Sequence, residues 1–576
     1  MPDENLQILI HQKNIADNSF EIKTDKAGVE LKSVERLPNK NYAILHIGIS
    51  AKADPQTFTI KSKGKAGRFN YIYTLAERTP HPRGLDQSDI IYLITPDRFA
   101  NGDRANDSFE DMNQTGINRG APYQRHGGDI QGIIDNLDYI QDLGMTTIWP
   151  NPLLENDQPL ESYHGYAITD HYKIDKRFGT NDLFGALVDS LHNRDMKIIQ
   201  DVIYNHIGDQ HYLYQDIPDS TWFHFWDTYT RTTYRATTLM DPYASANEKR
   251  IFTDGWFDKH MPDLNQKNEA LAKYLVQQTL WWIEKYQIDA LRIDTYAYPD
   301  QDFMRAWAKQ VKAAFPDIFL FAETWVHGPT VQGWFMGSNG LGPDKNHLDG
   351  LTDFQIHYAI NDALTIEQGW TEGVSKLYYT LAADYIYKNP ENMVTFLDNH
   401  DLARFLGHVN GDIRKLKMGL GLMFTLRGIP SVYYGTEILM QETNGHGKIR
   451  EDFPGGWAGD SLNKFTPEGR TPDENEVYDY IKKLSDLRKS NPAINKGGTM
   501  QFVPLEGLYV YFRYHKNDLV MVAINTSKEK RMIKTSEYSE VLKGKTSLRD
   551  LNDKAFLLKD KMEIEPFEIL IWEVKD

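Results

Sequence analysis

The chain has 576 residues, 40% hydrophobic and 25% charged, so it is long enough for several domains with buried cores and is not dominated by disorder. Its 64 basic residues are outnumbered by 81 acidic ones, and the formal net charge of −17 argues against nucleic acid or an anionic membrane as a partner. No cysteine occurs, which excludes disulfides and thiolate metal sites, and a neutral substrate is the simplest expectation.

The first residues, MPDENLQILI, lack a basic segment followed by an apolar run, and no apolar stretch is long enough to span a bilayer. We therefore expect a soluble protein with no membrane partner. A signal peptide removed during export would leave no trace, so a periplasmic and a cytoplasmic location both stay open.

Residues 1–85 alternate polar and apolar in the runs LQILIHQ, AILHIGI, TFTIKS and NYIYTL, with Gly, Pro and Asn between them. This alternation predicts a small N-terminal β-sandwich, because one face of each strand is buried. The segment TPHPRGLDQSD that follows is typical of a linker.

Residues 86–497 change to short apolar runs that alternate with helical patterns, which predicts an α/β fold. The connection formed by residues 206–260 is far longer than usual and rich in aromatic residues, so we expect a lobe inserted after the third strand. Alternation returns in residues 498–576 and predicts a C-terminal antiparallel β-sandwich. Eight runs are candidate strands, the number that a (β/α)8 TIM barrel needs: IIYLI, TTIW, KIIQD, ALRID, FLFAE, GLTDF, VTFLD and PSVYY.

Several candidate strands end in acids. In ALRID, Arg292 precedes Asp294 by two residues and so lies on the same face of the strand, where it can hold the carboxylate ionised. A salt bridge inside the core is the alternative for this pair taken alone. In a barrel the C-terminal ends of all strands meet on one face, so acids far apart in the sequence surround one pocket. The other acids in such positions are Asp201, Glu323, Asp398 and Asp401.

A second polar cluster follows the first candidate strand. The segment NGDRAND begins at Asn101, and the segment HGGD ends at Asp129. Oxygen ligands crowded into a glycine-bearing loop suit Ca²⁺, which needs neither sulfur nor histidine. A polar turn explains the same composition, so composition alone leaves both readings open.

These residues resemble a known family. The motifs DVIYNH, MPDLN, ALRID, ETW, FLDNHD and GIPSVYYGTE stand in the order and spacing of the α-amylase superfamily of glycoside hydrolases, and the resemblance covers nearly the whole chain. The N-terminal β-domain, the MPDLN segment and a tryptophan two residues after Glu323 look like the cyclomaltodextrinase, maltogenic amylase and neopullulanase branch.

The resemblance implies a role for each matching residue. Asp294 matches the nucleophile, Glu323 the general acid that later acts as base, and Asp401 the third acid, which binds ring hydroxyls. Asp201 and Asp398 are expected to be structural. The residues expected to bind substrate are Tyr166, His206, Arg292, Trp325 and His400. The ligands implied for a structural Ca²⁺ are Asn101, Asp103, Asn106, Asp107, Gly127 and Asp129.

The sequence departs from the superfamily pattern just after the nucleophile. Many amylases carry Lys and His where this chain has Ala297 and Tyr298. We therefore do not expect the second amylase calcium or the usual acceptor-side contacts. Aromatic residues in the inserted lobe either form the core of that lobe or stack on sugars: Trp222, Phe223, Phe225 and Trp226.

The resemblance predicts a retaining hydrolase of α-1,4-glucosidic bonds that acts on cyclodextrins and maltooligosaccharides, with pullulan as a further candidate. Two alternatives stay open. A transglycosylase would pass the covalent intermediate to a sugar instead of water, and a non-catalytic amylase-like subunit is ranked last because all three acids are present. The chain is expected to be a monomer or a homodimer.

Overall fold

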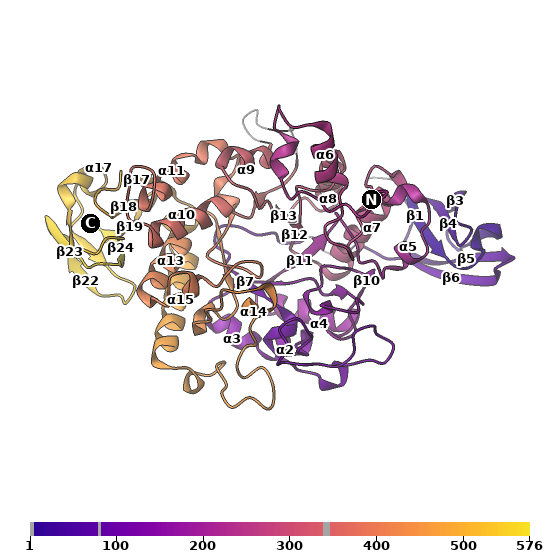
Figure 1. The fold of residues 1–576 in the computed structure, drawn as a ribbon, viewed down its shortest axis with the longest axis horizontal. Coiled ribbons are helices and arrows are strands. Elements are labelled where there is room, and N and C mark those ends of the chain that lie inside the picture. The colour runs from indigo at the N-terminus through magenta and orange to yellow at the C-terminus, as the bar shows by residue number, and fades with distance from the viewer. Residues whose placement is uncertain (1–4, 79–81, 338–341, 343–345) are drawn as a thin grey trace.

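The computed structural model describes residues 5–78, 82–337, 342 and 346–576. Figure 1 shows three parts along the longest axis: an N-terminal β-domain at one end, a central barrel with its helices, and a C-terminal β-domain at the other end. The sequence prediction of this architecture is confirmed. Three residues of the expected linker, 79–81, lie outside the described part of the chain.

The N-terminal domain is a sandwich of two antiparallel sheets. Its first sheet has the order β1 (Asn5–His11), β4 (Tyr42–Ile49), β3 (Val29–Arg36), and its second has the order β2 (Ser19–Lys23), β5 (Gln56–Gly64), β6 (Gly67–Leu75). Alternate apolar residues of both sheets form one buried cluster, as the period of two predicts. The domain therefore has a core of its own.

The N-terminal domain docks on the side of the barrel. The amide of Gln7 donates to Gln277 Oε1 at 2.8 Å, on helix α7 (Glu269–Tyr286). Asp216, at the foot of the inserted lobe, accepts hydrogen bonds from Asn39 and Asn41 and pairs with His11. These contacts fix the domain against one outer helix and the base of the lobe.

The eight predicted runs form one parallel eight-stranded sheet. Its order is β14-β13-β12-β11-β8-β7-β16-β15, and a parallel bridge between Thr352 and Val394 closes it into a barrel. Each strand is almost wholly buried, because helices cover the outside and side chains fill the inside. The strands are β7 (Ile91–Ile94), β8 (Thr147–Pro150), β11 (Lys197–Ile203), β12 (Ala290–Asp294), β13 (Phe319–Ala322), β14 (Gly350–Leu351), β15 (Val394–Phe396) and β16 (Ile429–Tyr433).

Helices follow the strands, and most begin at a side-chain cap. Asn268 caps α7 through the Leu271 amide, and Thr471 and Glu474 form a capping box at α15 (Pro472–Ser490). The other helices of this region are α1 (Pro96–Phe99), α2 (Ile130–Asp135), α3 (Leu137–Asp142), α4 (Asn181–His192), α8 (Gln301–Ala314), α9 (Pro329–Met336), α10 (Phe354–Thr365), α11 (Val374–Ala382), α12 (Phe405–His408), α13 (Ile413–Thr425), α14 (His446–Ile449) and α16 (Pro492–Asn495).

The inserted lobe contains α5 (Tyr212–Gln215) and α6 (Ala246–Asp254). Trp222 and Phe223 are buried, while Phe225 is half exposed and Trp226 lies under the guanidinium of Arg250. Of the two readings of the lobe aromatics, Trp222 and Phe223 therefore belong to its core. A short hairpin of β9 (Leu154–Glu155) and β10 (Asp170–Ile174), which the sequence did not predict, follows the second barrel strand.

The C-terminal domain is antiparallel. Its larger sheet has the order β17-β18-β19-β24-β21-β22, a smaller one pairs β20 with β23, and a short helix, α17 (Ser539–Leu542), lies between them in sequence. No helix in the described part of the chain is long and apolar enough to cross a membrane. The strands are β17 (Gly498–Gln501), β18 (Leu508–His515), β19 (Asp518–Asn525), β20 (Arg531–Lys534), β21 (Ser547–Arg549), β22 (Ala555–Leu557), β23 (Lys561–Ile564) and β24 (Glu568–Lys575).

Candidate active site

A single buried arginine connects the acids at the strand ends. Arg292 Nη1 lies 2.7 Å from Asp294 Oδ1 and 2.9 Å from Asp201 Oδ1, and Arg292 Nη2 lies 3.0 Å from Glu323 Oε2. Asp201, Asp294 and Glu323 come from the neighbouring strands β11, β12 and the end of β13, which pair in register. Three of the five acids that the sequence placed at strand ends therefore meet at one guanidinium, which gives them a common counter-charge.

Asp201 holds the wall beside this arginine. Its Oδ2 accepts hydrogen bonds from Trp149 Nε1 at 3.0 Å and from the Tyr166 hydroxyl at 3.1 Å. The same hydroxyl lies 2.6 Å from His400 Nε2, and the two rings stack. Tyr166 and His400 are therefore fixed in place by groups that also touch Arg292, as a binding platform requires.

The two central carboxyls differ in proton affinity. Burial raises the pKa of Glu323 to about 7, against the opposing effect of Arg292. Burial raises the pKa of Asp294 to about 6, again opposed by Arg292, which contacts it directly. Both carboxyls therefore keep a proton to higher pH than a free carboxyl does, and Glu323 keeps it to the higher pH of the two. Two carboxyls separated in this way can serve as an acid and a nucleophile.

Asp401 is kept ionised by the guanidinium of Arg450 and by two histidine rings that lie close to it. His400 Nε2 lies 3.2 Å from Asp401 Oδ2, Arg450 Nη2 lies 3.2 Å from Asp401 Oδ1, and His446 approaches at 3.6 Å. Although burial opposes it, these groups hold the pKa of Asp401 well below its usual range. Asp398 instead accepts from the Phe405 amide at 2.7 Å, which fits the structural role expected for it.

The remaining two predicted substrate residues lie apart from Arg292. His206 is buried and stacks on Phe257, its Nε2 has no hydrogen-bond partner, and burial lowers its pKa to about 3, so the ring is neutral. Trp325 is 47% exposed and stacks on Phe354 at 5.3 Å. One face of Trp325 is thus used for packing, and the rest of its ring reaches solvent.

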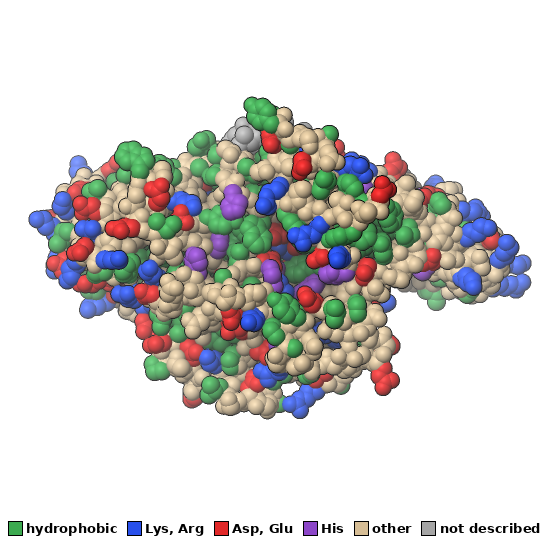
Figure 2. Space-filling model, in the orientation of Figure 1, with side chains coloured by type: hydrophobic (Ala, Val, Ile, Leu, Met, Phe, Trp, Pro, Cys, Tyr) green, Lys and Arg blue, Asp and Glu red, His purple; other side chains and the backbone are tan. Residues whose placement is uncertain are grey.

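Some residues of this group had no role in the sequence interpretation. Trp149 and His446 carry no motif signal, and Arg450 lies in the segment that follows the last barrel strand. Asp201 was expected to have only a structural role, yet its carboxylate accepts a hydrogen bond from Arg292. Figure 2 shows a hollow near the middle of the face, with histidine side chains around it.

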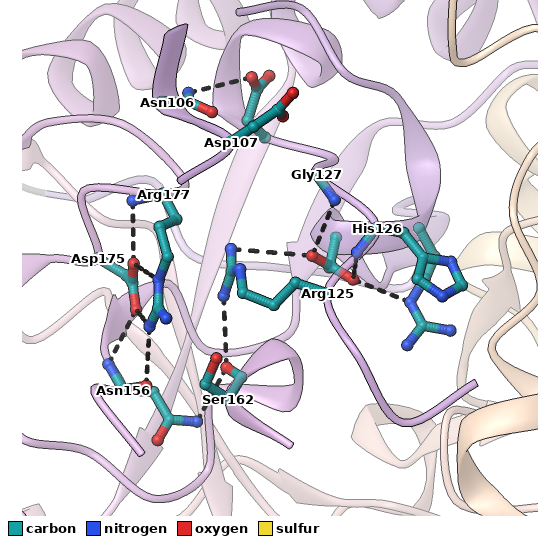
Figure 3. A network of polar contacts seen from close by, with 12 residues as sticks. Asn106, Asp107, Arg125, His126, Gly127, Asn156, Ser162, Asp175 and Arg177 are labelled. Atoms are coloured by element: carbon teal, nitrogen blue, oxygen red, sulfur yellow. Dashed lines mark hydrogen bonds and ion pairs between the residues drawn. The ribbon is translucent and has the colours of Figure 1, made fainter. Parts of the chain in front are cut away.

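The calcium prediction can be tested for chemical fit in the loop after β7. Asn101 Oδ1 and Asn106 Oδ1 are buried without a hydrogen-bond partner, and Asn101 Nδ2 donates to Asp107 Oδ1. A Cβ on Gly127 would lie 2.6 Å from Asp107 Oδ1, so the Gly127 backbone lies against this group. Figure 3 shows Asn106, Asp107 and Gly127 on the segments that meet here. These unsatisfied oxygens fit a hard cation.

Two of the predicted ligands also have structural partners. Asp129 caps α2 through the Gly132 amide and accepts from the amides of Gly102 and Asp103, while the Asp103 side chain accepts from the Ala105 amide. Among the described residues, no three His, Cys, Asp or Glu side chains gather as a metal site. A cation here would therefore depend on amide and main-chain oxygens beside Asp107.

A buried ion-pair network supports the second half of this loop. Asp97 accepts hydrogen bonds from the amides of His126 and Gly127, both labelled in Figure 3, and from Arg98 Nε. Arg98 Nη1 in turn donates to the carbonyl of Arg450 at 2.9 Å. The loop is thereby connected through two charged residues to an arginine that contacts Asp401.

Three family models match the chain. Alpha amylase, catalytic domain, matches residues 93–453; Cyclomaltodextrinase, N-terminal, matches residues 1–79; and Cyclo-malto-dextrinase C-terminal domain matches residues 499–573. The first covers more than half of the chain. The other two coincide with the β-domains on either side of the barrel.

Individual relatives agree with these matches. A cyclomaltodextrinase of Thermoanaerobacter pseudethanolicus is 27% identical over 82% of this chain and 77% of its own length. A beta/alpha-amylase of Paenibacillus polymyxa is 29% identical over 76% of this chain, which spans only 33% of that longer protein. The crystal structure of an Anoxybacillus alpha-amylase is 31% identical, with a TM-score of 0.70 over 85% of this chain and 98% of that one.

Proposed function

The chain belongs to the alpha-amylase family of glycoside hydrolases, and from this we propose that it is a retaining enzyme that cleaves α-1,4-glucosidic bonds of cyclodextrins and maltooligosaccharides, with pullulan as a further candidate. The observation that carries the proposal is the contact of one guanidinium, Arg292, with both Asp294 and Glu323. The cyclomaltodextrinases among the relatives support the substrate class.

In the first step, the protonated Glu323 gives its proton to the glycosidic oxygen while Asp294 attacks the anomeric carbon. The C–O bond to the leaving sugar breaks, and a covalent glycosyl ester forms on Asp294. In the second step, Glu323 as carboxylate takes a proton from water, whose oxygen displaces Asp294 and restores both carboxyls. The pKa order of the two groups supports these roles because Glu323 holds its proton to higher pH.

The surrounding residues would bind the sugar at the cleavage point. Asp401, held ionised by its neighbours, can accept hydrogen bonds from ring hydroxyls, and His400 and the neutral His206 offer further polar atoms. Tyr166 offers a flat face that is fixed by Asp201 and His400. Trp325 would stand on the acceptor side, beyond Glu323. These assignments rest on the geometry together with the family motifs.

A structural Ca²⁺ in the loop after β7 is part of the proposal. Asn101, Asn106, Asp107 and the backbone of Gly127 would hold the ion, and Asp103 and Asp129 would shape the loop around it. The bound ion would supply positive charge to a group of buried oxygens and would order the loop. The acids stand on later strands, so the catalytic steps need nothing from this site.

The test of the function is the first-formed product. Purified full-length enzyme on maltooligosaccharides should give α-configured product initially, observed by ¹H NMR before mutarotation, and initial β-product would contradict double displacement. In parallel, kcat/KM should be much higher on β-cyclodextrin than on soluble starch. Equal efficiency on the two would place the chain with ordinary α-amylases and contradict the proposed substrate class.

A further inference from the structure

A cavity of about 300 Å³ lies between the barrel and the C-terminal domain. Gln87 and Asn392, which line it, precede the barrel strands β7 and β15, so the cavity is at the N-terminal end of the strands, opposite the candidate acids. Its other side is formed by Arg513 on β18 and by the segment that follows α16. A small ligand here would contact both domains without touching the candidate active site.

Arg513 is a buried cation whose guanidinium is only partly used. The residue is 2% exposed, and its Nη2 donates to the carbonyls of Ile494 at 2.9 Å and Gly497 at 2.7 Å. Its Nη1 is buried without a hydrogen-bond partner, and no carboxylate of the described residues lies within ion-pair distance of it. Because a buried charge without a counter-charge is costly, an anion beside this guanidinium would be stabilising.

A second buried arginine lies close to Arg513. Arg488 donates to the carbonyls of Phe424 and Gly428, and its Nε has no hydrogen-bond partner. Burial lowers the pKa of Arg513 to about 10, and burial together with the charge of Arg513 lowers the pKa of Arg488 to about 9. Two neighbouring cations are thus held in a region that disfavours their charge, and an anion in the cavity would offset it.

The rest of the cavity lining offers donors and one unusual acceptor. Lys496 and Glu391 line the cavity and are both exposed, so they place one charge of each sign at its rim. Gln87 Nε2 donates to Asn392 Oδ1 at 2.6 Å, which turns the Asn392 amide nitrogen away as a donor. Asn495 Oδ1, on another residue of the lining, is a buried acceptor without a partner. A ligand that satisfies this set needs acceptor oxygens and also an O–H group.

We propose that this cavity binds inorganic phosphate, with Arg513 and Lys496 as its cationic contacts and Asn495 Oδ1 as the acceptor for its O–H. At pH 7 phosphate carries negative charge and keeps at least one proton, so it matches both kinds of group. Sulfate has nearly the same shape but no proton to donate, so it would leave Asn495 Oδ1 unsatisfied beside another oxygen. Bound phosphate would join the barrel to the C-terminal domain and stabilise the folded chain.

The experiment is calorimetric titration of the full-length protein at pH 7 and constant ionic strength, with inorganic phosphate and with sulfate. Arg513→Gln is the direct variant, but it also removes contacts with two carbonyls, so two variants at the rim carry the test. Lys496→Glu reverses a cation, and Glu391→Gln removes the acid that opposes an anion; both side chains are exposed, so both variants should fold. The matched control is Lys543→Glu, which makes the same charge change on an exposed lysine that does not line the cavity.

Phosphate should bind about tenfold more tightly than sulfate, the effect of one hydrogen bond to a buried acceptor. Its dissociation constant should rise about three- to tenfold in Lys496→Glu and fall about two- to fivefold in Glu391→Gln, as expected for exposed charges near a ligand. The control should keep the wild-type value. Absent binding, equal binding of the two anions, or phosphate binding that neither rim variant changes would each overturn the proposal. No cleavage of sugar enters these measurements, so such a result leaves the proposed function standing.

Discussion

Two buried clusters of oxygen-bearing side chains stand near the C-terminal ends of the barrel strands, and they differ in how their charge is compensated. Asp201, Asp294 and Glu323 surround Arg292, a cation that the chain itself supplies. In the loop after β7, Asp107 faces Asn101, and its pKa is raised by burial and by the neighbouring Asp129. The catalytic cluster therefore carries its own counter-charge, whereas the proposed Ca²⁺ would supply one to the loop.

The largest effect is expected where the acids themselves are changed. Glu323→Gln removes the proton donor and should lower kcat on maltooligosaccharides by about 10²–10⁴-fold. Asp294→Asn removes the nucleophile and should cost at least as much. Asn and Gln preserve shape and can still contact Arg292, so circular dichroism should show an intact fold. A folded Asp294→Asn protein with near-wild-type kcat would mean that another residue is the nucleophile.

The loop should respond to an ion that the catalytic cluster ignores. At free Ca²⁺ about 100 times its Kd, binding to the native state alone stabilises it by about 2.7 kcal/mol. Excess chelator should therefore lower the Tm by several degrees, and Asp107→Asn should make the Tm insensitive to chelator. Asp362→Asn, in an ion pair far from the loop in sequence, is the control and should keep the sensitivity. An unchanged Tm together with no metal by elemental analysis would contradict the calcium proposal.

The loop acids also give the calcium-free protein a pH dependence of stability. Burial raises the pKa of both Asp107 and Asp129 above the usual 3.8, so the folded state binds protons that the unfolded state has already released. In chelator, the stabilisation from these two acids is therefore fully present below the unfolded pKa. It is lost as the pH rises through the pKa of the folded state. With Ca²⁺ bound, that loss should be smaller. Parallel melts at pH 4 and pH 7, with and without Ca²⁺, measure the difference.

In the catalytic cluster, a change of pH should alter the rate of turnover. Turnover needs Asp294 ionised and Glu323 protonated, so kcat/KM should rise as pH passes about 6 and fall as it passes about 7. The two groups share Arg292, so the limbs report the coupled pair. Each limb should approach a tenfold change per pH unit. Glu323→Gln should remove the alkaline limb, and a profile flat from pH 5 to pH 8 would contradict the assignment.

The sequence could predict the barrel strands and the acids at their ends, but not the contacts that loops make with one another. Each barrel strand is a short buried run that ends in a recognisable position, so all eight strands and the convergence of Asp294 and Glu323 followed from pattern and topology. The contacts of Arg450 and His446 with Asp401 could not be predicted in this way, because they join loops after different strands. The cavity that Arg513 lines is likewise a property of packing volume, which no local spacing encodes. The domain boundaries and the monomer or homodimer state stay predictions.

The smallest effect is expected at Trp325, which contacts neither cluster. Its ring stacks on Phe354 and donates to Tyr358, so removal to Ala loses packing as well as any sugar contact. Water needs no platform, whereas a sugar acceptor must be held while it attacks the glycosyl ester on Asp294. Trp325→Ala should therefore lower the ratio of transfer to hydrolysis products about three- to tenfold while hydrolysis falls less.

Tyr358→Phe keeps the ring and removes the hydrogen bond, so it separates support of Trp325 from stacking on the sugar. If Trp325→Ala lowers transfer and hydrolysis by the same factor, the tryptophan only supports the fold of the strand end, and acceptor binding must be sought elsewhere.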